Sequence, residues 1–130
     1  MTLSYPRHVV LGNAATNVDV TLHIRNNAAP NSPGITFTLE MLEPDEEHPS
    51  VRTSSSPSSP RVFWAGCTRH TFWNVQPNAS VDVRLSACFV SAGIYDLNRF
   101  RFVVARPDNP KPLTVFFPVE YLIQVATETY

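Results

Sequence analysis

The sequence contains few of the residues that mark specialised chemistry. Two cysteines and four glycines among 130 residues are too few for the disulfide framework of a small secreted domain. Neither a glycine-rich phosphate loop nor a G-x-S-x-G nucleophile motif is present. No run approaches the roughly 18 apolar residues of a transmembrane segment, and the first residues lack the charged start and apolar core of a secretory signal. We therefore expect a cytosolic chain without a transmembrane segment.

The sequence also lacks a large excess of positive or negative charge. The formal net charge is -1, which argues against a nucleic-acid surface. The histidines lack paired ligand spacing, so we expect no metal site; they are His8, His23, His48 and His70. No cluster of acid, base and nucleophile can be assembled, so we predict no catalytic residue, no cofactor and no enzyme activity.

What the sequence does contain is alternation of apolar and polar residues with a period of two. Hydrophobic residues make up 43% of the chain, enough for the core of one domain over residues 1–130. The alternation predicts an all-β, antiparallel β-sandwich of about seven to eight strands. The extended segments are residues 8–11, 18–24, 35–41, 61–67, 72–73, 79–89, 94–105 and 113–126.

Several finer expectations follow from the same pattern. Segments 18–24 and 35–41 are predicted to be neighbouring strands joined by a polar loop. The apolar phase slips near Asn98, which predicts a bulge or break there. Residues 106–112 are predicted to be a loop, and Pro118 favours an edge position or a bend within one long final strand.

The stretch from Ala79 to Ala105 is predicted to be a strand, a corner and a second strand. A glycine two residues before a tyrosine, here Gly93 and Tyr95, is a common way to cross between the sheets of a sandwich. We expect Gly93 to permit the corner. The Tyr95 ring should pack inward while its hydroxyl finds a backbone partner.

Two features leave alternatives open. The acidic and Ser-Pro-rich segment 43–60 has too few apolar groups to order itself, so it is predicted to be a flexible surface loop. Its Ser-Pro dipeptides also permit a phosphorylated regulatory loop. Cys67 and Cys88 invite comparison with an inter-sheet disulfide, but Cys88 lies in the outward phase, which favours two free thiols.

Two residue groups are candidates for an interaction surface. Arg99 and Arg101 alternate with phenylalanines, so both guanidinium groups are expected on one face with Arg106 nearby. The alternative is an ordinary solvated sheet face. The second group supplies aromatic side chains in both strand phases, so some should be exposed and others should belong to the core; it comprises Phe63, Trp64, Phe72 and Trp73.

One stretch of the sequence resembles a known family. The pattern Leu85-x-Ala87-Cys88-Phe89, followed by Gly93-x-Tyr95-x-Leu97-Asn98, is similar to the C-terminal immunoglobulin-like region of large TRAPP (trafficking protein particle) subunits, most nearly subunit eight. The weaker match covers about residues 61–105, and the first half of the chain contributes only a generic sandwich pattern.

The resemblance implies an immunoglobulin-like fold and a non-catalytic interaction module of a cytosolic vesicle-tethering complex. That complex acts at Golgi and autophagy-related membranes and exchanges nucleotide on a Rab GTPase through other subunits. The implied partners are TRAPP subunits and, indirectly, the Rab protein, with peripheral membrane association. The alternative from the residues is an extracellular adhesion or carbohydrate-binding sandwich, which requires a Cys67–Cys88 bond and an occupied Asn78 sequon.

Overall fold

The computed structural model describes residues 1–12, 15–44, 62–106 and 109–127. These residues form an all-β, immunoglobulin-like sandwich, which confirms the predicted fold class. Its strands are β1 (Thr2–Ser4), β2 (His8–Leu11), β3 (Thr16–Arg25), β4 (Ile35–Met41), β5 (Phe63–Ala65), β6 (Arg69–Val75), β7 (Ser80–Phe89), β8 (Gly93–Asp96), β9 (Phe100–Arg106), β10 (Asn109–Val115) and β11 (Leu122–Thr127).

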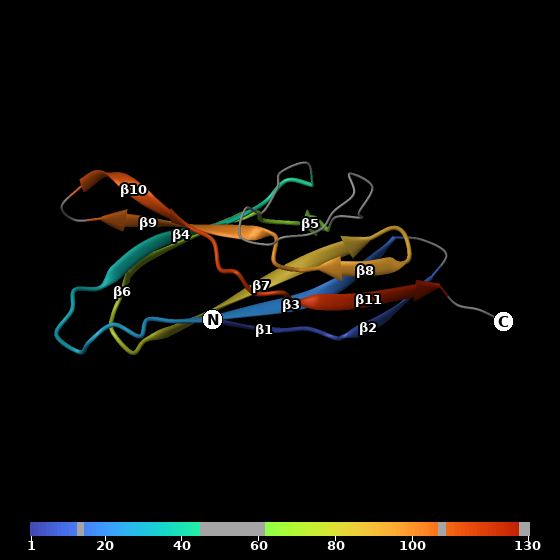
Figure 1. Cartoon of the computed structure of the whole chain (residues 1–130), viewed down its shortest axis with the longest axis horizontal. Coiled ribbons are helices and arrows are strands. Elements are labelled where there is room, and N and C mark those ends of the chain that lie inside the picture. The colour runs from blue at the N-terminus through green and yellow to red at the C-terminus, as the bar shows by residue number, and fades with distance from the viewer. Residues whose placement is uncertain (13–14, 45–61, 107–108, 128–130) are drawn as a thin grey trace.

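The strands form three sheets. The first sheet has the order β1-β3-β7-β5, the second β10-β9-β4-β6 and the third β2-β11-β8. All pairings are antiparallel except that of β2 with β11. In Figure 1, β8 and β11 lie beside β3 and β7, whereas β9 and β10 continue to the other end of the molecule.

The prediction that segments 18–24 and 35–41 are neighbours is wrong. They become β3 and β4, which belong to the first and second sheets respectively. The connecting residues 26–34 therefore cross between sheets rather than closing a hairpin. Alternation shows which face of a strand is buried but does not specify its partner, so two regular strands in succession look the same whether or not they pair.

The described residues form more strands than expected because two predicted strands are each divided. The break predicted near Asn98 is confirmed, since β8 ends at Asp96 and β9 begins at Phe100. The final run is two strands, β10 and β11, separated by an irregular stretch that contains Pro118. Residues 109–112, expected in a loop, belong to β10, and β1 was not predicted.

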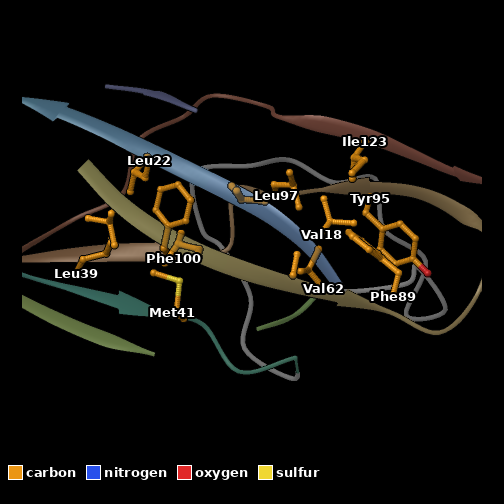
Figure 2. Packing of buried hydrophobic residues seen from close by; sticks show 14 of the residues in the cluster. Val18, Leu22, Leu39, Met41, Val62, Phe89, Tyr95, Leu97, Phe100 and Ile123 are labelled. Carbon is orange, nitrogen blue, oxygen red and sulfur yellow. The ribbon is translucent and has the colours of Figure 1, made fainter. Parts of the chain in front are cut away.

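The corner after β7 has the predicted form. Tyr95 is 3% exposed, and its ring meets that of Phe89 edge to face with centroids 4.8 Å apart. Figure 2 shows these two rings beside Ile123 in the core. The Tyr95 hydroxyl donates to the backbone carbonyl of Ser91 at 2.7 Å. Gly93 begins β8, where the chain passes from the first sheet to the third.

Two polar side chains, the half-buried Asp96 and the buried Asn98, hold the two strand breaks together. Asp96 Oδ1 accepts from the backbone N–H of Asn98 at 2.9 Å and from that of Tyr121 at 3.0 Å. The Asn98 amide donates to the carbonyls of Phe117 and Val119, both at 2.6 Å. Backbone groups that leave a sheet need new partners when buried, and Asp96 and Asn98 supply them for the irregular stretch between β10 and β11.

Two remaining expectations concern the loop and the cysteines. Of the predicted flexible segment 43–60, residues 45–60 and their Ser-Pro dipeptides lie outside the described residues. Cys67 is exposed, Cys88 is partly buried, and both are free thiols. This state gives no support to the extracellular alternative, which requires them to be bonded.

Candidate interaction surface

Arg99 does not belong to an exposed surface, and its expected position beside Arg101 is wrong. Arg99 is 7% exposed and lies in the break between β8 and β9 rather than on a strand. Its Nη2 donates to the carbonyl of Glu43 at 2.7 Å, and its own carbonyl accepts from the Trp64 indole at 3.1 Å. The slip in strand phase that starts at Asn98 is what turns this side chain inward.

The four candidate aromatic residues divide as expected into exposed and packed side chains. Phe63 is 50% and Trp73 78% exposed. Trp64 and Phe72 pack against the core, Phe72 with its ring centroid 5.3 Å from that of Phe37. These last two are structural rather than part of a surface. Phe63 and Trp73 belong to different sheets, so the candidate set does not form one patch.

Trp73 instead shares a sheet face with Arg101. On the outer face of the second sheet, Thr71, Thr38, Val103 and Thr114 stand opposite one another across its four strands. Trp73 follows Thr71 by two residues and is 78% exposed, so it points outward beside Thr71, at the point where the register between β4 and β6 shifts. The Thr38 and Thr71 hydroxyls are hydrogen-bonded at 3.0 Å. We call this surface the threonine face; it comprises Thr38, Thr71, Trp73, Val103 and Thr114.

A row of charges borders the threonine face. Arg69, Glu40 and Arg101 are cross-strand neighbours two residues along their strands from Thr71, Thr38 and Val103, and therefore lie on the same face. Arg101 Nε lies 3.2 Å from Glu40 Oε1, and Arg69 Nε lies 3.8 Å from Glu40 Oε2. The Glu40 carboxylate thus pairs with both guanidinium groups. Arg106, also a candidate, is exposed at the end of β9.

A second exposed surface was missed in the sequence. On the outer face of the third sheet, Ile94 of β8 and Val10 of β2 are 65% and 59% exposed, and Leu122 of β11 is 47% exposed. His8 and Gln124 lie between them, joined by a 3.1 Å hydrogen bond. The signal was available for Ile94, because Tyr95 next to it was expected to point inward and alternation then turns Ile94 outward.

Another missed cluster has the residue types of a catalytic triad. Ser4 Oγ lies 2.8 Å from His23 Nε2, and His23 Nδ1 lies 2.7 Å from Asp82 Oδ1. The three residues lie on the outer face of the first sheet, where His23 and Asp82 are cross-strand partners. Acyl transfer also needs donors aimed at an oxyanion and a concave site for the substrate. The outer face of a sheet supplies neither, so the cluster is best explained as a link that ties β1 to β3 and β7.

One titratable group near the strand breaks has a perturbed pKa. Burial raises the pKa of Tyr121 above its usual range, with smaller contributions in the same direction from Tyr5 and Asp96. In the part of the chain that the structure describes, no group of three or more His, Cys, Asp or Glu side chains could hold a metal ion. The same residues contain no helix long and apolar enough to cross a membrane.

The sequence comparisons agree with this architecture. The family model of the TPPC8 C-terminal Ig-like domain matches residues 1–107. No curated protein and no solved structure matches the chain. The matched residues include the corner, the Asp96–Asn98 segment and three of the four strands that carry the threonine face.

Proposed function

Because the chain belongs to the TPPC8 C-terminal Ig-like domain family, we propose that it is a non-catalytic module that docks a large TRAPP subunit onto other subunits. The assembly is a cytosolic complex peripheral to Golgi membranes, acting in ER–Golgi transport and autophagy. It exchanges nucleotide on a Rab GTPase through its other subunits. Membership in this family supports a module of a TRAPP subunit; the docking role, pathways and location are our proposal.

The observation that best supports a docking role is the exposure of Trp73 on the threonine face. A tryptophan that is 78% exposed leaves a large apolar surface in water, and tryptophan and arginine are the residues most enriched at interface hot spots. Because threonine and valine side chains are stiff at χ1, they lose little conformational entropy when a partner covers them. The threonine face therefore offers a flat, ordered platform around one large anchor.

The charges next to this face indicate the kind of partner surface that would fit. Arg69 lies 3.8 Å from Glu40 and its side chain is 71% exposed, so a partner that presents acidic side chains at this border would be attracted to it. Glu40 also holds both arginines in place before binding, which lowers the entropic cost of their ordering. We propose that an acidic rim on a neighbouring TRAPP subunit meets this row.

The experiment compares two alanine substitutions of exposed aromatic residues. Each variant is expressed with an affinity tag in cells of the organism that naturally makes the protein, so that its partner subunits are present. Trp73→Ala is expected to reduce co-purification of the other TRAPP subunits at least tenfold, since loss of a hot spot costs about 2 kcal/mol or more. Phe63→Ala is the matched control because Phe63 is also exposed but lies on a different sheet. Both variants should keep the wild-type melting temperature to within a few degrees.

An unchanged yield of partner subunits with Trp73→Ala would contradict the threonine face as the docking surface. If Phe63→Ala lost the partners instead, docking would belong to the first sheet. A third variant, Ile94→Glu, probes the apolar face of the third sheet in the same assay. Loss of TRAPP subunits with Ile94→Glu alone would move the docking surface there.

A further inference from the structure

An apolar pocket opens at one end of the sandwich. It has a volume of about 270 Å3 and lies where β3 and β6 end and β4 begins, against β9 and the end of β10. Its walls are eight apolar side chains, namely Ile24, Ile35, Phe37, Val75, Phe102, Val104, Val115 and Phe117. The walls therefore come from the first and second sheets and from the irregular stretch after β10.

The wall around Phe117 is fixed in place. The Phe117 ring meets that of Phe102 edge to face with centroids 5.1 Å apart, and its carbonyl accepts the Asn98 amide. Phe37 also packs against Phe102, with centroids 5.9 Å apart. A pocket whose walls are held by the core can keep its shape when it is empty, so little ordering cost is added when a ligand enters.

The size and polarity of the pocket limit what can occupy it. A pocket with apolar walls gives a water molecule too few hydrogen-bonding partners and favours an apolar occupant. The volume of about 270 Å3 is near the lower end of the roughly 300–1,000 Å3 of small-molecule pockets, which suits a short apolar chain.

The polar groups of the pocket all lie where β3 ends. They are Arg25, Asn26 and Asn27. The Asn26 side chain is already occupied, because its amide donates to the Val75 carbonyl at 2.9 Å and its oxygen accepts from the Ala28 N–H at 3.0 Å. Arg25 is exposed and donates from Nη2 to Asn78. Arg25 is one of the residues that line the pocket, and a guanidinium group has five N–H donors, so the bond to Asn78 does not use all of them.

We propose that this pocket binds a medium-chain fatty acid, with its tail between the sheets and its carboxylate at Arg25. The apolar walls and the volume favour the aliphatic chain, and the cation at the mouth favours an anionic head group. The site shares no residue with the threonine face, so this inference stands or falls separately from the proposed docking function.

The direct test is titration of the 130-residue chain with decanoate, kept below the concentration at which it forms micelles, followed by methyl NMR. Saturable shifts are expected for the methyl groups of Ile24, Ile35, Val75, Val104 and Val115. Decanol and decyltrimethylammonium serve as neutral and cationic probes of the same length. Decanoate should bind about fivefold more tightly than decanol, the value of a solvent-exposed ion pair, and the cationic probe should bind most weakly.

Matched variants locate the tail and the head group. Val104→Phe fills the pocket and should abolish binding, whereas Val103→Phe changes the next residue of β9 on the opposite face and should not. Val115→Phe is a second filling variant, at a half-buried position, in case Val104→Phe does not fold. Arg25→Gln should weaken decanoate about fivefold without changing decanol, and Arg84→Gln on the outer face of β7 is its control.

Three results would overturn the proposal. Absence of saturable binding, or methyl shifts outside the pocket, would exclude a fatty-acid site here. Equal affinity for decanoate and decanol, unaffected by Arg25→Gln, would remove the carboxylate from Arg25. Binding of a leucine- or phenylalanine-bearing peptide in the pocket, in place of decanoate, would make it a protein-docking site.

Discussion

The segment from Tyr95 to Arg99 and the threonine face both carry polar side chains, but they use them differently. In the segment, the side chains of Tyr95, Asp96, Asn98 and Arg99 bond to backbone groups of other segments or of the corner. On the threonine face, Thr38 and Thr71 bond to each other across neighbouring strands. The first region uses polar groups to complete the fold, whereas the second leaves a regular surface available to a partner.

This contrast explains what the family motif encodes. Tyr95, Leu97 and Asn98 are at most 3% exposed. Each lies in the corner or in the segment that is hydrogen-bonded to the irregular stretch between β10 and β11. The residues through which the family was recognised therefore specify the scaffold. Trp73 and Arg101, which support the docking proposal, lie within the residues that the family model matches but outside the motif, so the motif does not locate the surface.

The largest expected effect on stability is a difference between Arg99 and Arg101, which the sequence predicted to lie on one face. Arg99→Glu should lower the free energy of unfolding by about 3–5 kcal/mol, since it buries a carboxylate beside the Glu43 carbonyl. Arg101→Glu should lower it by only about 1 kcal/mol, because its side chain is partly solvated. Urea denaturation of the two variants measures the difference. Equal losses would mean that Arg99 is not a structural residue.

A smaller loss in the free energy of unfolding is expected when the hydrogen bonds between the two strand breaks are removed. Asn98→Ala removes both hydrogen bonds to the Phe117 and Val119 carbonyls and should lower the free energy of unfolding by about 2–3 kcal/mol. Asn17→Ala, at an exposed position of β3, is the control and should change it by less than about 0.5 kcal/mol. If the two variants melted alike, the amide of Asn98 would not be what holds the irregular stretch after β10.

Asn98 and Arg99 also show how far the sequence could predict the structure. A period of two reveals the buried face of each strand, so β3, β4 and β7 could be located, and the phase slip revealed the break at Asn98. Which strands pair is decided by contacts far apart in the sequence, so the separation of β3 and β4 was missed. Arg99 was misplaced for a related reason, because regular alternation does not continue through a break whose geometry depends on Glu43 and Trp64.

The candidate surface was predictable only in part. Aromatic side chains in both strand phases correctly predicted that some of the four would be exposed, and Trp73 was among those named. The threonine face itself was not visible, because Thr38, Thr71, Val103 and Thr114 come from four different strands. The order of those strands in the sheet has to be known before the residues can be placed together.

The smallest expected effects come from two single hydroxyl groups, one from each region. Tyr95→Phe keeps the buried ring but loses the hydrogen bond to the Ser91 carbonyl, and should lower the free energy of unfolding by about 1–1.5 kcal/mol. Thr38→Val loses the bond to Thr71 at a partly solvated position, and valine has a high strand propensity, so a change below about 0.5 kcal/mol is expected. Thermal denaturation followed by far-UV circular dichroism can compare the two variants. If Thr38→Val lowered the free energy of unfolding as much as Tyr95→Phe, the threonine pair would stabilise the fold. A structural role would then explain the threonine face as well as docking does.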